Sequence, residues 1–322
     1  MSPSLAPRGL PGLAGAVLAG GASAGLFAVA LMHAGTALIF LAYLAAVPVF
    51  IAGLGAGVFA ALIASATGIA YLASSQPVNY AVAYAFINAL PCILLTTLAL
   101  RPQSGADKKS LRYSEGDVLT SACVYTCVVF LVLIGATWNE EGGLLGLTTR
   151  LIKEAAAPAT AQMDAAVAQQ FTEMVMRLVK FTPAMTGLSW VLILVISLVA
   201  AQIIVQKQKW NLRPAFAFHG LHVPGWLIFA VAATGMAGAF APAPYDYIGS
   251  NLSIILGLPF FFAGLAIVHV WAALQKSGNL ILTFFYLFMT ILPLFAVIPV
   301  FVGVIDQWAN FRQRFSRRNA ST

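Results

Sequence analysis

The sequence predicts an all-α protein, a polytopic transmembrane helical bundle with nine to ten membrane segments. Hydrophobic residues make up 61% of the 322 residues and charged residues only 8%, whereas about a quarter of a soluble globule is charged because its surface faces water. The mean hydropathy is +0.90, and no Lys, Arg, Asp or Glu occurs from Gly9 to Leu100. This composition excludes a soluble globule, a coiled coil, a disordered chain and a nucleic-acid-binding domain, and it leaves the lipid bilayer as the main partner.

A helix needs about 20 apolar residues to cross the hydrocarbon core of a bilayer. The first apolar run follows Arg8 and continues beyond the length of a cleaved leader, so we expect it to be retained as a spanning helix. The second and third runs are short and meet at the glycine-rich stretch 53–57, which leaves their boundary open. The nine predicted segments are Leu10–Met32, Ala37–Gly53, Gly57–Leu72, Tyr80–Leu100, Val118–Thr137, Met185–Val205, Pro224–Phe240, Leu252–Leu274 and Leu280–Ile305.

Basic residues set the expected orientation. The chain carries 17 Lys and Arg against 10 Asp and Glu, and such an excess in a membrane protein gathers in cytoplasmic loops. The basic connections follow the fourth, sixth and eighth segments and fall on one side if each segment crosses once. This scheme predicts a cytoplasmic N-terminus and treats residues 1–322 as a single integral membrane domain. The basic residues concerned are Arg101, Lys108, Lys109, Arg112, Lys207, Lys209, Arg213 and Lys276.

The last segment poses a conflict between length and charge. Leu280–Ile305 would measure about 39 Å as one helix against a core of about 30 Å, so one tilted crossing fits. Nine crossings, however, would leave four arginines outside, against the positive-inside rule. We give charge the greater weight and predict a hairpin broken near Leu292-Pro293, with ten segments and both termini inside. The arginines are Arg312, Arg314, Arg317 and Arg318.

Residues 139–181 form the one substantial extramembrane insert, which the scheme places outside. Its apolar residues recur at steps of three or four, which predicts one face of an amphipathic helix. Pro158 is expected to separate this helix from a shorter one around Leu144–Glu154. Either the insert is a lid or a partner-docking hairpin, or it lies on the membrane surface or caps the bundle. The apolar residues are Met163, Val167, Phe171, Met174, Leu178 and Phe181.

Gly21-Ala22-Ser23-Ala24-Gly25 matches the G-x-S-x-G pattern of serine hydrolases. That chemistry needs a nearby base and acid, but no acidic residue lies in any apolar segment. Small residues four apart are also common where membrane helices pack closely. We therefore predict that the protein is not an enzyme, that an intramembrane hydrolase is the weaker alternative, and that the Ser23 hydroxyl bonds a carbonyl one turn back. Four small-residue pairs have this spacing: Gly21/Gly25, Ala24/Ala28, Gly53/Gly57 and Ala60/Ala64.

A small set of polar residues could form a solute pocket. Asn88 lies near Pro91 in the fourth segment, where a buried amide needs partners and either joins helices or lines a cavity. Tyr245, Tyr247 and Asn251 lie close together at the outer end of the seventh and eighth segments. We expect these four residues to share a pocket on the outer half of the bundle, with aromatic-belt tyrosines as the alternative.

No cofactor or metal site is predicted. The sequence contains neither the P-loop pattern nor H-E-x-x-H. Cys92, Cys123 and Cys127 lie in apolar segments, where we expect them to act as small packing residues.

Three stretches carry a resemblance to a known family. They are Tyr247-Ile248-Gly249-Ser250-Asn251-Leu252, then Leu258 to Ala266 leading to His269, and Gly303 to Arg312, which includes Asp306. Together they resemble the YybS-like family of bacterial membrane proteins, most of all its alphaproteobacterial branch. The resemblance implies residence in the bacterial inner membrane and a family motif at His269, Asp306 and Arg312.

The YybS-like family is similar, at a distance, to the substrate-binding S components of energy-coupling-factor transporters. This likeness implies small-solute binding or transport, with an ATPase module or another membrane protein on separate chains. The alternative is a structural or assembly protein of the cell envelope that acts through residues 139–181 and the basic C-terminal tail. A pocket would favour the first function, and a solid bundle with an exposed apolar insert the second.

Overall fold

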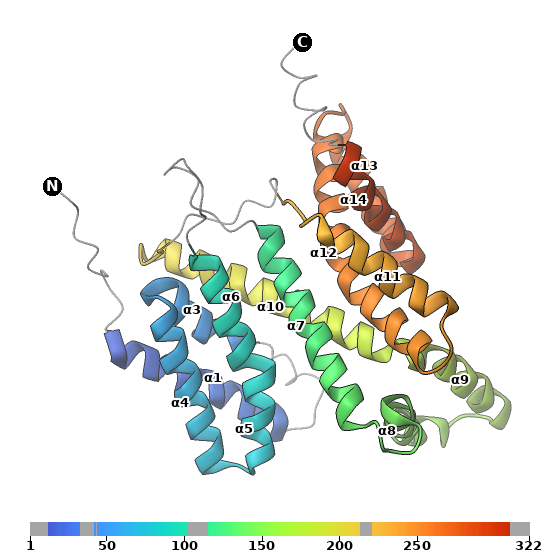
Figure 1. Cartoon of the computed structure of the whole chain (residues 1–322), viewed down its shortest axis with the longest axis horizontal. Helices are drawn as coiled ribbons and strands as arrows, with labels where there is room; N and C mark the ends of the chain where they lie inside the picture. Colours follow the sequence, from blue (N-terminus) through green and yellow to red (C-terminus); the bar gives the residue numbers. More distant parts are fainter. Residues whose placement is uncertain (1–11, 33–41, 43, 102–114, 213–220, 310–322) are drawn as a thin grey trace. The chain divides into compact units, whose positions relative to one another are not determined.

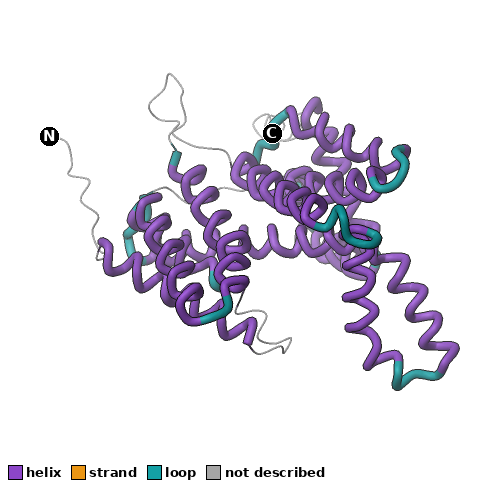
Figure 2. Tube along the Cα trace, turned by 60° about the horizontal axis from the view of Figure 1, so that its bottom comes forward, coloured by secondary structure: helices purple, strands orange, loops and turns teal. Residues whose placement is uncertain are grey.

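The computed structural model of the chain describes residues 12–32, 42, 44–101, 115–212 and 221–309. All regular secondary structure in these residues is helical, as Figure 2 shows, which confirms the predicted all-α class. The chain divides into two compact units: residues 1–122 with 190–223, and residues 123–189 with 224–322. The expected single membrane domain stays a prediction.

Unit 1 contains the N-terminal helices (Figure 1). Its first helices lie in the first three predicted segments, and a nearly continuous run forms the fourth. The unit also includes the first part of α7 and the second part of α10. The helices are α1 (Gly12–Met32), α3 (Ala46–Ala56), α4 (Val58–Ser75), α5 (Val78–Tyr84), the π-helical turn η1 (Ala85–Ala89), α6 (Leu90–Leu100), α7 (Glu115–Ala136) and α10 (Thr182–Lys207).

Gly57 separates α3 from α4 and resolves the boundary that the sequence left open. Its φ is 99°, in the left-handed region that glycine adopts without a steric cost. Its amide still donates to the carbonyl of Gly53 at 2.8 Å. The chain therefore changes direction at the end of the glycine-rich stretch.

Small residues bring α1 and α4 together, although not all of the predicted pairs contribute. A Cβ atom at Gly20 would collide with the backbone carbonyl of Ala64, whereas a Cβ at Gly21 or Gly25 would meet nothing within 4 Å among the described residues. Sequence spacing alone therefore chose the wrong glycines on α1. The alanines of the predicted pairs are buried as expected: Ala24, Ala28, Ala60 and Ala64.

Pro91 disturbs the run α5–η1–α6 without ending it. Proline has no amide hydrogen, so Pro91 cannot donate to the Ile87 carbonyl, its partner in a regular α-helix. The indole Nε1 of Trp190 donates to that carbonyl at 3.2 Å. The Trp190 side chain thus replaces the hydrogen-bond donor that Pro91 lacks.

Unit 2 contains the remaining described helices (Figure 1). It begins inside α7 and includes the insert, the first part of α10 and the C-terminal helices. These are α8 (Gly143–Thr160), α9 (Ala165–Leu178), the 3-10 turn η2 (Val179–Phe181), α11 (Trp226–Phe240), α12 (Tyr245–Ala273), α13 (Gly278–Ile291), the 3-10 turn η4 (Pro293–Ala296) and α14 (Val297–Ala309).

The insert is a pair of amphipathic helices, as predicted, but Pro158 does not separate them. Helix α8 continues through Pro158 to Thr160. Proline lacks only its own amide hydrogen, and the amide of Ala161 still donates to the carbonyl of Ala157. The turn lies instead at residues 161–164, so Met163 precedes α9. Neither α8 nor α9 has a buried residue, and several apolar side chains of α9, among them Val167, Met174 and Leu178, are exposed.

Glycines also set the packing of α12 against its neighbours. Gly238 of α11 and Gly249 of α12 lie directly against each other, and Gly264 and Gly303 bring α12 and α14 into backbone contact. Pro259 lies inside α12, which runs unbroken over 29 residues. A proline inside a helix removes one hydrogen bond and can break or kink it, but α12 is not broken at Pro259. The expected break near Leu292-Pro293 is confirmed by the end of α13 at Ile291.

Among the described residues, six helical stretches are long and apolar enough to span a membrane, and four shorter apolar helices accompany them. This supports a membrane protein with several spanning helices. The shorter helices cannot be assigned as crossings by length, so the count of nine to ten stays a prediction. The long stretches are Gly12–Leu31, Val58–Ser75, Val78–Leu100, Glu115–Ala136, Ala165–Lys207 and Tyr245–Ala273.

Candidate functional site

A pocket of about 530 Å³ lies in unit 2, where several helix ends meet. Its lining comes from the C-terminal ends of α7 and α11, the N-terminal ends of α8 and α12, and η2, which directly precedes α10. The volume is in the range of small-molecule sites, about 300–1,000 Å³. Its lining residues are Ile134, Trp138, Gly142 to Leu145, Lys180, Phe181, Gly238, Ala243, Pro244, Asp246 to Ile248 and Ser250.

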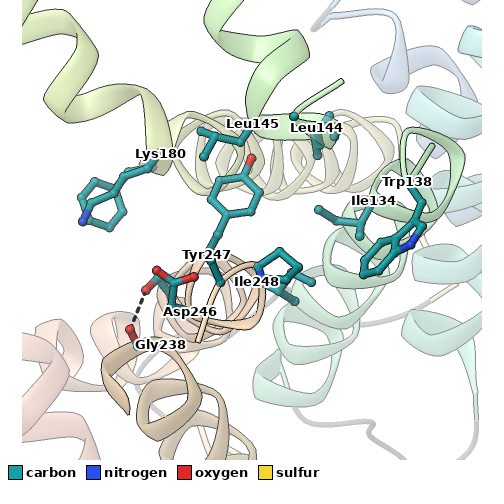
Figure 3. Close-up of a pocket in the computed structure, with 15 residues that line it drawn as sticks. Ile134, Trp138, Leu144, Leu145, Lys180, Gly238, Asp246, Tyr247 and Ile248 are labelled. Atoms are coloured by element: carbon teal, nitrogen blue, oxygen red, sulfur yellow. Dashed lines mark hydrogen bonds between the residues drawn. The ribbon is translucent and has the colours of Figure 1, made fainter. Parts of the chain in front are cut away.

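Apolar side chains form most of the pocket wall. Figure 3 shows Ile134 and Trp138 on one side of Tyr247, with Leu144 and Leu145 of the insert above it. The insert thus contributes to the pocket directly through the first residues of α8. A pocket of this kind excludes water from an apolar ligand, while the few polar groups determine the orientation of that ligand.

Tyr247 is the central polar residue of the pocket. Its side chain is 8% exposed, and its ring packs edge-on against Phe130, with the centroids 6.1 Å apart. The hydroxyl lies near Thr148 of α8 but makes no hydrogen bond of normal geometry with the described residues. Buried hydroxyls normally have a partner, so this group is available to a ligand.

Two charged residues of opposite sign line the same pocket. Asp246 lies in the first turn of α12, and its Oδ1 atom is buried with no hydrogen-bond partner among the described residues. Lys180 lies in η2 and is exposed, with its Nζ 4.8 Å from the ring centroid of Phe181. Both therefore remain able to bind groups of a ligand.

Asn251 supports the pocket from behind its wall. Its Oδ1 accepts from the amide of Ala184 at 2.9 Å, and its Nδ2 donates to the carbonyls of Lys180 at 2.9 Å and Tyr247 at 2.8 Å. The amide of Ala184 belongs to the first turn of α10, where helix amides lack intrahelical partners. Asn251 therefore holds two lining residues in place without being one itself.

Asn88 and Tyr245, the other predicted pocket residues, lie elsewhere. Asn88 is 2% exposed in η1 of unit 1, and its Nδ2 has no hydrogen-bond partner among the described residues. Tyr245 is 56% exposed and does not line the pocket. Of the four predicted residues, unit 2 therefore brings Tyr247 to the pocket and Asn251 behind it, and a pocket shared with Asn88 stays a prediction.

The residues of the proposed family motif are spread over α12, α14 and the tail. His269 is exposed in α12; its Nδ1 is 2.9 Å from the carbonyl of Leu265, and its Nε2 is 3.3 Å from the hydroxyl of Tyr286 in α13. Asp306 lies in α14 and is half-buried. Arg312 lies outside the described residues. The contacts of His269 indicate a residue that joins two helices.

Ser23 is buried in unit 1, but its hydrogen bonding differs from the sequence expectation. The hydroxyl donates to the carbonyl of Ala45, on another segment, and lies 2.7 Å from the hydroxyl of Tyr84. The expected bond to a carbonyl one turn back is therefore wrong. Gly68 permits this arrangement, since a Cβ there would lie 2.6 Å from the Tyr84 hydroxyl.

The cysteines are free and buried, as expected of packing residues. Among the described residues, no group of three or more His, Cys, Asp or Glu side chains is arranged to hold a metal ion.

A comparison with protein families gives one match over most of the chain. The family is described as predicted membrane protein (DUF2232), and its model matches residues 22–307. The chain belongs to the DUF2232 family. The comparison with curated proteins gives no match, and neither does the comparison with solved structures. Membership confirms the membrane class and extends over both units, whereas the likeness to the YybS-like family and to S components is not confirmed.

Sequence reasoning missed several pocket residues of this DUF2232 protein. Trp138 directly precedes the insert, and Leu145 and Lys180 lie near its two ends, far in the sequence from the tyrosine-rich rim. Asp246 stood between the two predicted tyrosines but was not selected. The signal that could have found them is topological, because residues 138–145, 180–181 and 238–250 all flank predicted outer helix ends.

Proposed function

We propose that this DUF2232 protein is a multi-pass protein of the bacterial inner membrane that binds a small solute in the pocket of unit 2. The observation that carries the proposal is the buried hydroxyl of Tyr247, which has no hydrogen-bond partner among the described residues and lies in an apolar pocket of about 530 Å³. The positive-inside scheme places this pocket on the outer side, where a solute would be captured. The role would be similar to that of an S component, with an ATPase module or another membrane protein on separate chains.

The test is equilibrium dialysis of the purified protein against a metabolite extract of the expressing bacterium, followed by mass spectrometry. We expect the wild-type protein to retain at least one solute and Leu145→Trp, which fills the pocket, to lose it. Leu151→Trp is the matched control, because Leu151 lies on the same helix, is 55% exposed and does not line the pocket. Equal retention by wild type and Leu145→Trp, or no retained solute, would contradict the proposal.

The alternative function, in envelope structure or assembly, also has an observation in its favour. Val167, Met174 and Leu178 of α9 are 51%, 56% and 60% exposed, so the described residues of the unit leave this part of the apolar face of α9 uncovered. Replacing these three residues with Gln would impair an envelope role and leave solute retention unchanged. A bound solute that persists in this triple variant, with no change in envelope integrity, would favour the solute-binding function.

A further inference from the structure

The chemistry of the pocket residues points to a class of ligand. The pocket combines one carboxylate, one ammonium group, one phenol hydroxyl and apolar walls. Asp246 Oδ1 and Tyr247 Oη are buried without hydrogen-bond partners among the described residues. A buried acceptor without a partner is costly, and a charged donor compensates for that cost best. The group that fits beside Asp246 is therefore an ammonium.

The ammonium group of Lys180 lines the same pocket as Asp246 but interacts with a different residue. Lys180 interacts with the ring of Phe181 through its Nζ at 4.8 Å, a cation–π arrangement that leaves its N–H donors free for an anion. Its backbone position is fixed by the hydrogen bond from Asn251 to the Lys180 carbonyl. Figure 3 shows Lys180 and Asp246 on the same side of the Tyr247 ring. A ligand that meets both must carry a positive and a negative group.

Apolar surface completes the pattern. Ile134, Trp138, Leu144 and Leu145 face the remaining part of the pocket, and they would cover the apolar part of a ligand and gain free energy by excluding water. We propose that the pocket binds a zwitterion with an apolar part, its ammonium at Asp246 and its anionic group at Lys180. This inference rests on the proposed function and narrows it to one ligand class.

Two sources provide this chemistry, namely a free amphipathic amino acid and the headgroup of an ethanolamine phospholipid. Both carry an ammonium close to an anionic group and an apolar portion. The test therefore has two arms, both with the full-length protein. One arm measures binding of radiolabelled L-leucine in detergent; the other measures retention of phosphatidylethanolamine from nanodiscs by native mass spectrometry, with phosphatidylglycerol as the lipid without an ammonium.

We expect one of the two probes to bind, and Asp246→Asn to weaken its binding about ten-fold or more through loss of a charge-assisted hydrogen bond. Lys180→Met should weaken it as well. Asp164→Asn and Lys153→Met are matched controls from the insert, because neither residue lines the pocket. In the leucine arm, N-acetylleucine, which lacks the ammonium, should not compete.

The inference is overturned if neither probe binds, if phosphatidylglycerol is retained as well as phosphatidylethanolamine, or if N-acetylleucine competes as well as leucine. It is also overturned if Asp246→Asn and Lys180→Met both bind like wild type. Should Asp246→Asn fail to fold, as judged by gel filtration, Lys180→Met with the analogue comparison decides the question. The proposed function fails separately, when Leu145→Trp leaves the dialysis result unchanged.

Discussion

Ser23 and Tyr84 illustrate how single hydroxyl groups join helices in unit 1. A hydroxyl has one hydrogen, and Ser23 donates its own to the Ala45 carbonyl. Tyr84 must therefore donate to the Ser23 oxygen across their 2.7 Å contact. The hydrogen bonds from Tyr84 to Ser23 and from Ser23 to Ala45 account for the burial of the serine hydroxyl.

This direction of donation predicts unequal effects of two substitutions. Ser23→Ala leaves the Tyr84 hydroxyl without an acceptor and should lower the free energy of unfolding by about 1 kcal/mol. Tyr84→Phe should cost about half as much, because Ser23 keeps its bond to Ala45. Unfolding in mixtures of dodecyl sulfate and dodecyl maltoside measures the two stability changes. Additive effects in the double variant would show that the two hydroxyl groups do not interact. A fluorophosphonate probe should not label Ser23.

Asn251 is the residue on which the geometry of the pocket depends most. Its amide connects α10, η2 and α12 through three hydrogen bonds. Asn251→Ala should weaken ligand retention and also lower stability, because three backbone groups each lose a hydrogen bond. Asn251→Asp should preserve the bond from Ala184 but lose the two donated bonds. A variant that retains ligand as wild type does, measured by the same dialysis, would show that Lys180 and Tyr247 need no such support.

At the scale of helices, close approach depends on which glycine faces a neighbour. Gly20 and Gly21 are adjacent on α1, but only Gly20 lies against Ala64 of α4. Gly20→Ala should therefore force α1 and α4 apart and lower thermal stability in detergent. Gly21→Ala is its matched control and should be neutral or raise stability by up to about 1 kcal/mol, since alanine favours the helix. Equal effects of the two substitutions would contradict the packing of α1 on α4.

The pattern of predicted and missed features has a physical basis. Composition and hydropathy predict the helices because each membrane segment must satisfy its own backbone. Pro293 and the arginines of the tail predict the break after Ile291, and the spacing of apolar residues predicts the amphipathic insert. These patterns could not select Gly20 over Gly21, or exclude an interruption at Pro259, because those outcomes depend on neighbouring helices. The pocket was predicted only at Tyr247, since Lys180 and Trp138 approach it through tertiary structure.

At the scale of the molecule, the pocket itself bears on topology. Around it lie the C-terminal ends of α7 and α11, the N-terminal end of α12, and η2, which leads into α10. This is expected if α7, α10, α11 and α12 cross the membrane in alternate directions. That arrangement agrees with the positive-inside scheme, in which the basic loops after Leu100 and Lys207 lie inside. The insert and the pocket then share the outer side.

The remaining topological question is the side of the C-terminus. Helices α13 and α14 have 14 and 13 residues, which gives each a length of about 20 Å, short of the core of about 30 Å. A break between two short arms is the structure expected of a hairpin that returns to its starting side, and four arginines follow the second arm. Since each arginine outside would oppose the positive-inside rule, we predict a cytoplasmic C-terminus.

Fusions of alkaline phosphatase and of green fluorescent protein after Thr322 test this prediction, because phosphatase is active only outside and the fluorescent protein only inside. We expect the green fluorescent protein fusion to fluoresce and the alkaline phosphatase fusion to be inactive. Fusions after Lys209 and after Gln162, in the turn between α8 and α9, serve as the inside and outside references. If the Thr322 fusions behave like those at Gln162, residues 278–309 cross the membrane once and the four arginines lie outside. In that case the break after Ile291 is a kink within a single crossing. The backbone contact between α12 and α14, and not the positive-inside rule, then determines the side of the C-terminus.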